Sequence, residues 1–178
     1  MLSCISLTFL GPILPKRIRS LAAFGDRTIA ACGHDIVICE YGKIVGELRA
    51  HTGSVASIVV LGSKLVSAGE DGLVVVWDLD GLKESLRFNL PPGVVPTIVI
   101  HPESYLNKVL IGTSSGLLFL YNIRVGELVH RFEPLPAGIT CLAQSPVVDV
   151  VGVGLADGRF RVMDIREARV LAEMKQTG

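Results

Sequence analysis

Apolar residues fall in short runs along the whole chain, and most of these runs are rich in β-branched side chains. The clearest examples cover residues 36–38, 57–61, 73–77, 97–100 and 117–121. Runs of this length and composition are typical of strands, and helical periodicity is nearly absent. Turn pairs that end in glycine separate them, namely Asp71-Gly72, Ser115-Gly116 and Asp157-Gly158. Such pairs supply the positive φ of tight hairpins, so the pattern predicts an all-β protein.

The pattern also repeats. One motif recurs: an apolar run ends in a large residue, which is followed by an acid or amide and then by another apolar residue. Its copies are Trp77-Asp78-Leu79, Tyr121-Asn122-Ile123 and Met163-Asp164-Ile165, with Cys39-Glu40-Tyr41 as a weaker copy. The copies are 38, 44 and 42 residues apart, and a further amphipathic strand follows each one. A period of about 40–45 residues with four strands per unit indicates propeller blades. We expect four blades, at about 12–50, 51–93, 94–137 and 138–178.

Composition narrows the class of protein. Hydrophobic residues make up 49% of the 178 residues, which is enough to bury a core and excludes intrinsic disorder. The 17 basic and 17 acidic residues balance, so bulk charge gives no general attraction to nucleic acid or to an anionic membrane. Four cysteines without a Cys-x-x-Cys pair are too few for a disulfide scaffold, and no apolar run reaches the length of a transmembrane helix.

The first dozen residues contain an apolar stretch, Leu2–Leu10, of the kind found in signal peptides. A signal peptide carries positive charge before that stretch, whereas Lys16, Arg17 and Arg19 follow it. We therefore expect an outer strand or an irregular arm here. The basic cluster is interpreted as a solvated strand edge, with local contact to a phosphate backbone as the alternative. Arg159 and Arg161 alternate along a strand and share one face, which the sequence assigns to no partner.

The sequence contains three candidate catalytic, nucleotide-binding or metal motifs, and the residues around each of them argue against that function. Gly112-Thr113-Ser114-Ser115-Gly116 has the Gly-x-Ser-x-Gly spacing of a nucleophile elbow, but a strand follows it instead of a helix. Gly152-x-Gly154-x-x-x-Gly158 has the wrong spacing for a dinucleotide loop. Cys32, His34 and Cys39 offer three metal ligands without a fourth nearby, and buried cysteines explain them better. We expect no enzyme activity, no cofactor, no metal and no small-molecule substrate.

The second unit resembles the WD-repeat family in detail. That family links a His between blades, a Ser or Thr on the second strand, an Asp in the next turn and a Trp on the third strand. His51, Ser67, Asp71 and Trp77 match these positions, and such a hydrogen-bonded set has a structural role.

The other units depart from this pattern. The third has Thr113 and Tyr121 but no His, the fourth keeps only Asp157, and the first has Cys39 in place of Trp. Seven blades are common in the family, and four would leave unpaired strand edges at both ends. We therefore expect this chain to be part of a larger propeller.

Residues 101–112 and 138–154 are similar to segments of a narrower family, the WD-repeat proteins of the small-subunit processome of the Utp twenty-one type, which are subunits of the Utp-B complex. The resemblance implies a non-enzymatic scaffold in the nucleolus that acts in pre-rRNA processing and small-subunit (18S) rRNA maturation. It implies other Utp-B subunits and processome proteins as partners, contact with pre-rRNA or small nucleolar RNA, and no membrane. The alternative is a generic WD-repeat adaptor unrelated to ribosome biogenesis.

Overall fold

The computed structural model describes residues 16–102 and 104–175. Sixteen strands are found in this part of the chain, and they form four antiparallel sheets of four strands each. Sheet 1 contains β1 (Ile18–Phe24), β2 (Arg27–Cys32), β3 (Asp35–Glu40) and β4 (Lys43–Arg49), and sheet 2 contains β5 (Val55–Leu61), β6 (Lys64–Gly69), β7 (Leu73–Asp78) and β8 (Lys83–Asn89). Sheet 3 contains β9 (Pro96–Ile100), β10 (Lys108–Thr113), β11 (Leu118–Asn122) and β12 (Glu127–Arg131), and sheet 4 contains β13 (Ile139–Gln144), β14 (Val150–Leu155), β15 (Arg159–Asp164) and β16 (Arg169–Lys175).

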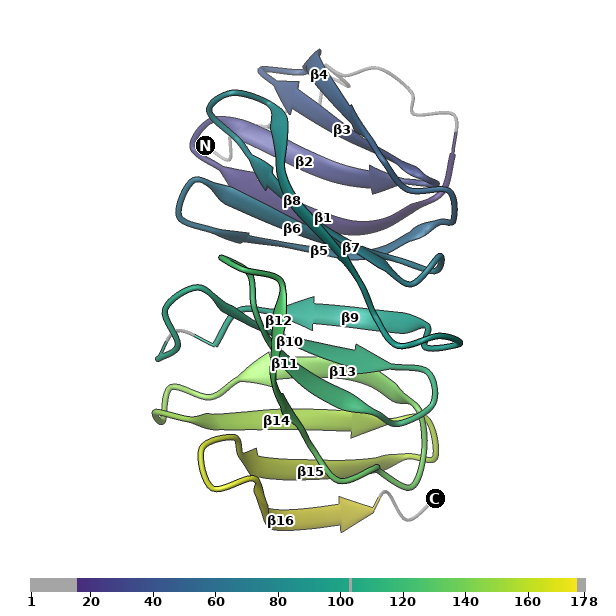
Figure 1. Ribbon diagram of the computed structural model, residues 1–178, viewed down its shortest axis with the longest axis vertical. Helices are drawn as coiled ribbons and strands as arrows, with labels where there is room; N and C mark the ends of the chain where they lie inside the picture. The colour runs from purple at the N-terminus through teal and green to yellow at the C-terminus, as the bar shows by residue number, and fades with distance from the viewer. Residues whose placement is uncertain (1–15, 103, 176–178) are drawn as a thin grey trace, which may run out of the picture.

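Each sheet is a meander in which consecutive strands pair, and we number the sheets as blades 1 to 4. The first strands of the blades face one another in series, because β1 contacts β5, β5 contacts β9 and β9 contacts β13. Figure 1 shows the blades following one another from the purple sheet at one end to the yellow-green sheet at the other. The all-β class and the propeller with four blades are therefore confirmed.

The core lies between the blades rather than inside any one of them. One apolar cluster joins blades 1 and 2 around Ile38 and Trp77, a second joins blades 2 and 3 around Val76 and Phe119, and a third joins blades 3 and 4. Central strands are buried on both faces, as β6 illustrates, and this explains why their sequences are continuous apolar runs. A blade is thus stabilised mainly by its neighbours.

Hydroxyl groups on the first strands fasten one blade to the next. Ser20 Oγ in β1 accepts the backbone N–H of Ile58 at 3.1 Å, and Ser57 Oγ in β5 accepts that of Val99 at 3.1 Å. The sequence did not reveal these contacts, because a single Ser in a strand carries no signal of its partner on another sheet.

The expected arm or strand at residues 1–12 lies outside the described residues. In the part that the structure does describe, no helix is long and apolar enough to cross a membrane.

Candidate functional site

Four side chains of blade 2 join in one chain of hydrogen bonds. Trp77 Nε1 in β7 donates to Ser67 Oγ in β6 at 2.9 Å, and Ser67 Oγ lies 2.8 Å from His51 Nε2. His51 Nδ1 lies 3.2 Å from Asp71 Oδ1, in the turn between β6 and β7. The structure thus brings together the four residues that the WD pattern singles out. Three of them are buried, and Asp71 is half-buried at the end of the chain of bonds.

The proton positions along this chain follow from its chemistry. Burial lowers the pKa of His51, and the hydrogen bond and charge of Asp71 oppose this only in part, so the imidazole is neutral at pH 7. Because the indole can only donate, Ser67 accepts from Trp77 and gives its own proton to His51 Nε2. His51 Nδ1–H then donates to Asp71. Each member of the set is thus hydrogen-bonded to another, and His51, Ser67 and Trp77 are buried.

Asp71 also anchors the backbone on both sides of the loop between blades. Its Oδ2 accepts the N–H of Thr52 at 2.7 Å and that of Gly53 at 3.3 Å, while its Oδ1 accepts the N–H of Leu73 at 3.0 Å. Burial alone raises the pKa of Asp71, but the hydrogen bonds from Thr52, Leu73, Gly53 and His51 outweigh it, so the pKa lies below its usual value. The carboxylate therefore ties the loop that leaves blade 1 to the turn of blade 2.

The third blade departs from the pattern more than the sequence comparison indicated. Tyr121 pairs with Val109 as Trp77 pairs with Leu65, so the residue in the register of Ser67 is Ile111 and not Thr113. The assignment of Thr113 to the Ser position was wrong by two residues. Thr113 Oγ1 instead lies 2.9 Å from the backbone N of Leu117, within the hairpin turn. A Thr at this point stabilises the turn locally, as Asp71 does in blade 2.

In blade 4, Asp157 occupies the turn position of Asp71 and accepts the backbone N–H of Arg159 at 3.1 Å. Asp157 is exposed, and the buried partners of blade 2 have no counterpart among the described residues there. This residue provides an internal comparison for the set in blade 2.

The other sequence candidates lie in ordinary turns and strands. The segment Gly112–Gly116 covers the end of β10 and most of the turn before β11, and Ser114 is exposed with its Oγ 3.5 Å from the carbonyl of Val95. Cys32 is buried and its thiol donates to the carbonyl of Lys16 at 3.2 Å. Within residues 16–102 and 104–175, no three His, Cys, Asp or Glu side chains gather as metal ligands would.

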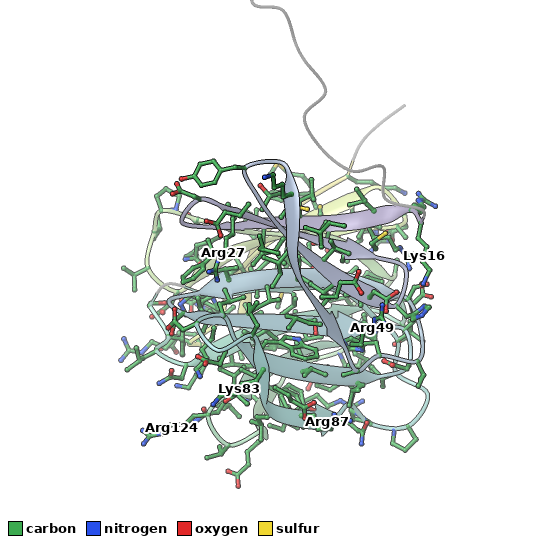
Figure 2. All side chains as sticks on the ribbon, turned by 90° about the horizontal axis from the view of Figure 1, so that it is seen from above. Lys16, Arg27, Arg49, Lys83, Arg87 and Arg124 are labelled. Carbon is green, nitrogen blue, oxygen red and sulfur yellow. The ribbon has the colours of Figure 1, made fainter. Side chains whose placement is uncertain are left out.

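Basic side chains are distributed around the outside of the blades. Figure 2 labels Lys16, Arg27, Arg49, Lys83, Arg87 and Arg124, which belong to different strands and turns. Several are paired with acids: Lys16 Nζ lies 2.9 Å from Asp35, and Arg27 Nε lies 3.1 Å from Glu40.

The other basic residues noted in the sequence also form ion pairs. Arg19 pairs with Glu70, and Arg159 and Arg161 both pair with Glu173 on β16. These contacts favour the interpretation of the Lys16–Arg19 cluster as a solvated edge, because the charges of Lys16 and Arg19 are balanced locally.

Two loops outside the WD pattern lie side by side at one end of blades 3 and 4. Ser104 Oγ donates to Asp149 Oδ1 at 2.6 Å, which joins the β9–β10 loop to the β13–β14 loop. Tyr105 packs against the core between these blades, but Leu106, Val147 and Val148 are exposed. We call these three side chains the loop cluster. Leu106 faces solvent, and Asn107, which follows it, turns the chain with a positive φ of 56°.

Comparison with known proteins assigns the chain to a family. Residues 2–178 match the model of the WDR36/Utp21 first beta-propeller. The U3 small nucleolar RNA-associated protein 21 homolog of Schizosaccharomyces pombe is 32% identical over 98% of this chain and 20% of its own length. WD repeat-containing protein 36 of Homo sapiens is 29% identical over 97% of this chain and 19% of its own length. The chain thus spans about a fifth of these relatives.

Solved structures show the same arrangement of blades. The computationally designed Ika8 protein superposes with a TM-score of 0.75 at 21% identity, covering 89% of this chain and 49% of that one. The designed Ika4 protein superposes with a TM-score of 0.74 at 20% identity, covering 87% of this chain and 99% of that one. At these identities the likeness concerns the fold alone. The family match over nearly all residues goes further, and the chain belongs to the WDR36/Utp21 family, in the region of its first β-propeller.

Proposed function

We propose that this chain is a non-enzymatic WD-repeat scaffold in ribosome biogenesis. The observation that carries the proposal is the match of residues 2–178 to the first propeller of WDR36/Utp21. The relative from Schizosaccharomyces pombe bears the name U3 small nucleolar RNA-associated protein 21 homolog, which supports a role beside that RNA. Within this proposal the protein acts in the small-subunit processome, in pre-rRNA processing and 18S rRNA maturation, and it resides in the nucleolus.

The role of the hydrogen-bonded set of blade 2 in this scaffold is structural. His51, Ser67, Asp71 and Trp77 hold the turn of blade 2 against the loop from blade 1, and each polar group is satisfied by another member or by backbone. A rigid arc of blades presents loops and edges in fixed positions, which suits a protein that holds partners together. We further propose that residues 12–50, 51–93, 94–137 and 138–178 are its structural units.

The partners in this proposal are other Utp-B subunits and processome proteins, with contact to pre-rRNA or small nucleolar RNA. The balanced charges of the blades favour protein partners over extensive contact with a phosphate backbone. The loop cluster is the surface we assign to a protein partner. Its apolar side chains are held out by loops that the Ser104–Asp149 bond joins, and exposed apolar groups of this kind gain most when a partner covers them.

Affinity purification of the tagged chain from cells tests the proposal. We expect U3 small nucleolar RNA and processome proteins to be enriched over an unrelated small nucleolar RNA. The double variant Leu106→Asp/Val148→Asp should lose protein partners while retaining its circular dichroism spectrum. The matched control is Val125→Asp, which adds a charge at another exposed apolar residue, in the β11–β12 turn.

Recovery of the folded protein with peptide partners but without U3 RNA or processome proteins would contradict the proposal. It would favour the alternative, a WD-repeat adaptor outside ribosome biogenesis.

A further inference from the structure

A pocket of about 240 Å³ opens at the junction of blades 2 and 3. Its apolar lining comes from Val76, Leu86 and Ile123, and its polar lining comes from Lys64, Ser85, Asn107 and Arg124. Both blades have a described neighbour on their other face, because blade 2 packs on blade 1 and blade 3 packs on blade 4. The pocket therefore lies in the middle of the row of blades, between two complete junctions.

At the junction of blades 1 and 2, a cation of the chain itself spans the corresponding place. Arg27 at the start of β2 pairs in register with Glu40, and its Nη1 donates to the carbonyl of Leu79 on blade 2 at 3.1 Å. Lys64 has the place of Arg27 in β6, since it pairs in register with Asp78. Within the described residues, Lys64 makes no hydrogen bond to the turn of blade 3. The space that the guanidinium of Arg27 spans in the first junction is thus left open in the second.

Two cations border this open space, and one acid offsets part of their charge. Lys64 Nζ lies 3.6 Å from Asp78 Oδ1. Arg124, labelled in Figure 2, is exposed and forms no ion pair within the described part of the chain. Its backbone N–H donates to Asn122 Oδ1 at 2.9 Å, which fixes the start of the turn that carries the guanidinium. Two positive charges against one negative charge leave the pocket with a net attraction for an anionic group.

The lining matches a side chain that has both an aliphatic stem and a carboxylate. The carboxylate accepts hydrogen bonds from an ammonium and a guanidinium, which are its strongest partners in proteins. The methylene groups of the stem contact the aliphatic side chains of the lining, Val76, Leu86 and Ile123. A nucleobase would find no aromatic ring to stack on in this lining. The volume also lies below the roughly 300 Å³ at which pockets for small molecules begin. A glutamate side chain meets all of these conditions.

We propose that the pocket binds a glutamate side chain of a protein partner, whose carboxylate is held between Lys64 and Arg124. The class of partner rests on the proposed function, in which the chain is a scaffold for proteins. The pocket is continuous with the loop cluster, because Asn107 lines the pocket and directly follows Leu106. One segment of a partner with a glutamate beside an apolar residue therefore covers both. Val125, although next to Arg124 in the chain, does not line the pocket.

Titration of the purified chain with N-acetyl-glutamyl-leucine amide, followed by nuclear magnetic resonance, tests the pocket. We expect shifts of the Ile123 methyl and Arg124 Nε–H signals and a dissociation constant of about 1–10 mM. The neutral probe N-acetyl-glutaminyl-leucine amide should bind at least about fivefold more weakly, and so should the glutamyl probe to Lys64→Gln or Arg124→Gln. The matched control is Arg166→Gln, because Arg166 follows Ile165 in blade 4 as Arg124 follows Ile123, but it does not line the pocket. Circular dichroism checks that each variant remains folded.

Three results would overturn the proposal. The first is no shift at the pocket or equal binding of the two peptide probes, and the second is binding of the glutamyl probe that Arg124→Gln leaves unchanged. The third is tighter binding of inorganic phosphate than of the glutamyl probe, which would favour a phosphate group as the occupant. The titration uses the purified chain, so the pocket can fail this test while the chain still recovers U3 small nucleolar RNA from cells. Loss of that RNA with normal binding of the glutamyl probe would instead count against the proposed function alone.

Discussion

Removing the carboxylate of Asp71 tests the hydrogen-bonded set of blade 2. Asp71→Ala leaves five donors without their acceptor: the backbone N–H groups of Thr52, Gly53 and Leu73, the hydroxyl of Thr52 and the imidazole of His51. Thr52 is exposed and finds water, whereas the side chain of His51 is buried and does not. One buried donor left unpaired costs about 1–3 kcal/mol, and the exposed ones contribute less. We expect the free energy of unfolding to fall by about 2–3 kcal/mol, measured by urea denaturation.

The control for this change lies in blade 4. Asp157 has the same place in its turn as Asp71, but it is exposed and accepts one backbone N–H, that of Arg159. Asp157→Ala should therefore lower the free energy of unfolding by about 0.5–1 kcal/mol. Equal losses for the two variants, or a loss below about 0.5 kcal/mol for Asp71→Ala, would refute the reasoning, because the set would then add nothing beyond an ordinary turn.

Three further predictions concern His51 in blade 2 and the junction between blades 3 and 4. The folded chain holds the pKa of His51 below 6.5, so the unfolded chain binds the extra proton, and the free energy of unfolding should decline as pH falls below 6.5. Urea denaturation at a series of pH values should show this decline in the wild type and in the exposed-site variant His130→Gln, but not in His51→Gln. Gly112→Ala places a methyl group against Ile139, and overpacking should lower the free energy of unfolding by about 1–3 kcal/mol, measured by thermal denaturation. Thr97→Val removes the hydroxyl between blades 3 and 4 and should cost about 1 kcal/mol in urea.

The strands and turns could be predicted from the sequence because their signals are local. The run 73–77 has three consecutive valines, and the pair Asp71-Gly72 supplies a positive φ of 76° at the glycine. The strand β7 and its turn therefore follow from a few adjacent residues. The four-residue set of blade 2 could also be predicted from the sequence, because the WD pattern relates residues by their spacing along the chain.

Contacts between blades could not be predicted from the sequence, because they depend on how separate sheets stack. Ser20 and Ser57 accept backbone N–H groups from residues about 40 positions later, and an isolated Ser in a strand does not indicate its partner. The register of blade 3 was misjudged for a related reason: Thr113 is the nearest hydroxyl in the sequence, but strand pairing places Ile111 at the position that Ser67 has in blade 2. The register shifts in β1 and β5 put Ser20 and Ser57 at equivalent places, and such shifts become visible only once the strands are paired.

The central claim is that this member of the WDR36/Utp21 family acts as a scaffold on pre-ribosomal particles. Sedimentation of the tagged chain from cell extract on a sucrose gradient, with and without ribonuclease, tests it most directly. The account predicts that the chain travels with large particles that contain U3 small nucleolar RNA and shifts to light fractions after ribonuclease treatment. A folded chain that sediments only as small complexes, with or without ribonuclease, would contradict the claim.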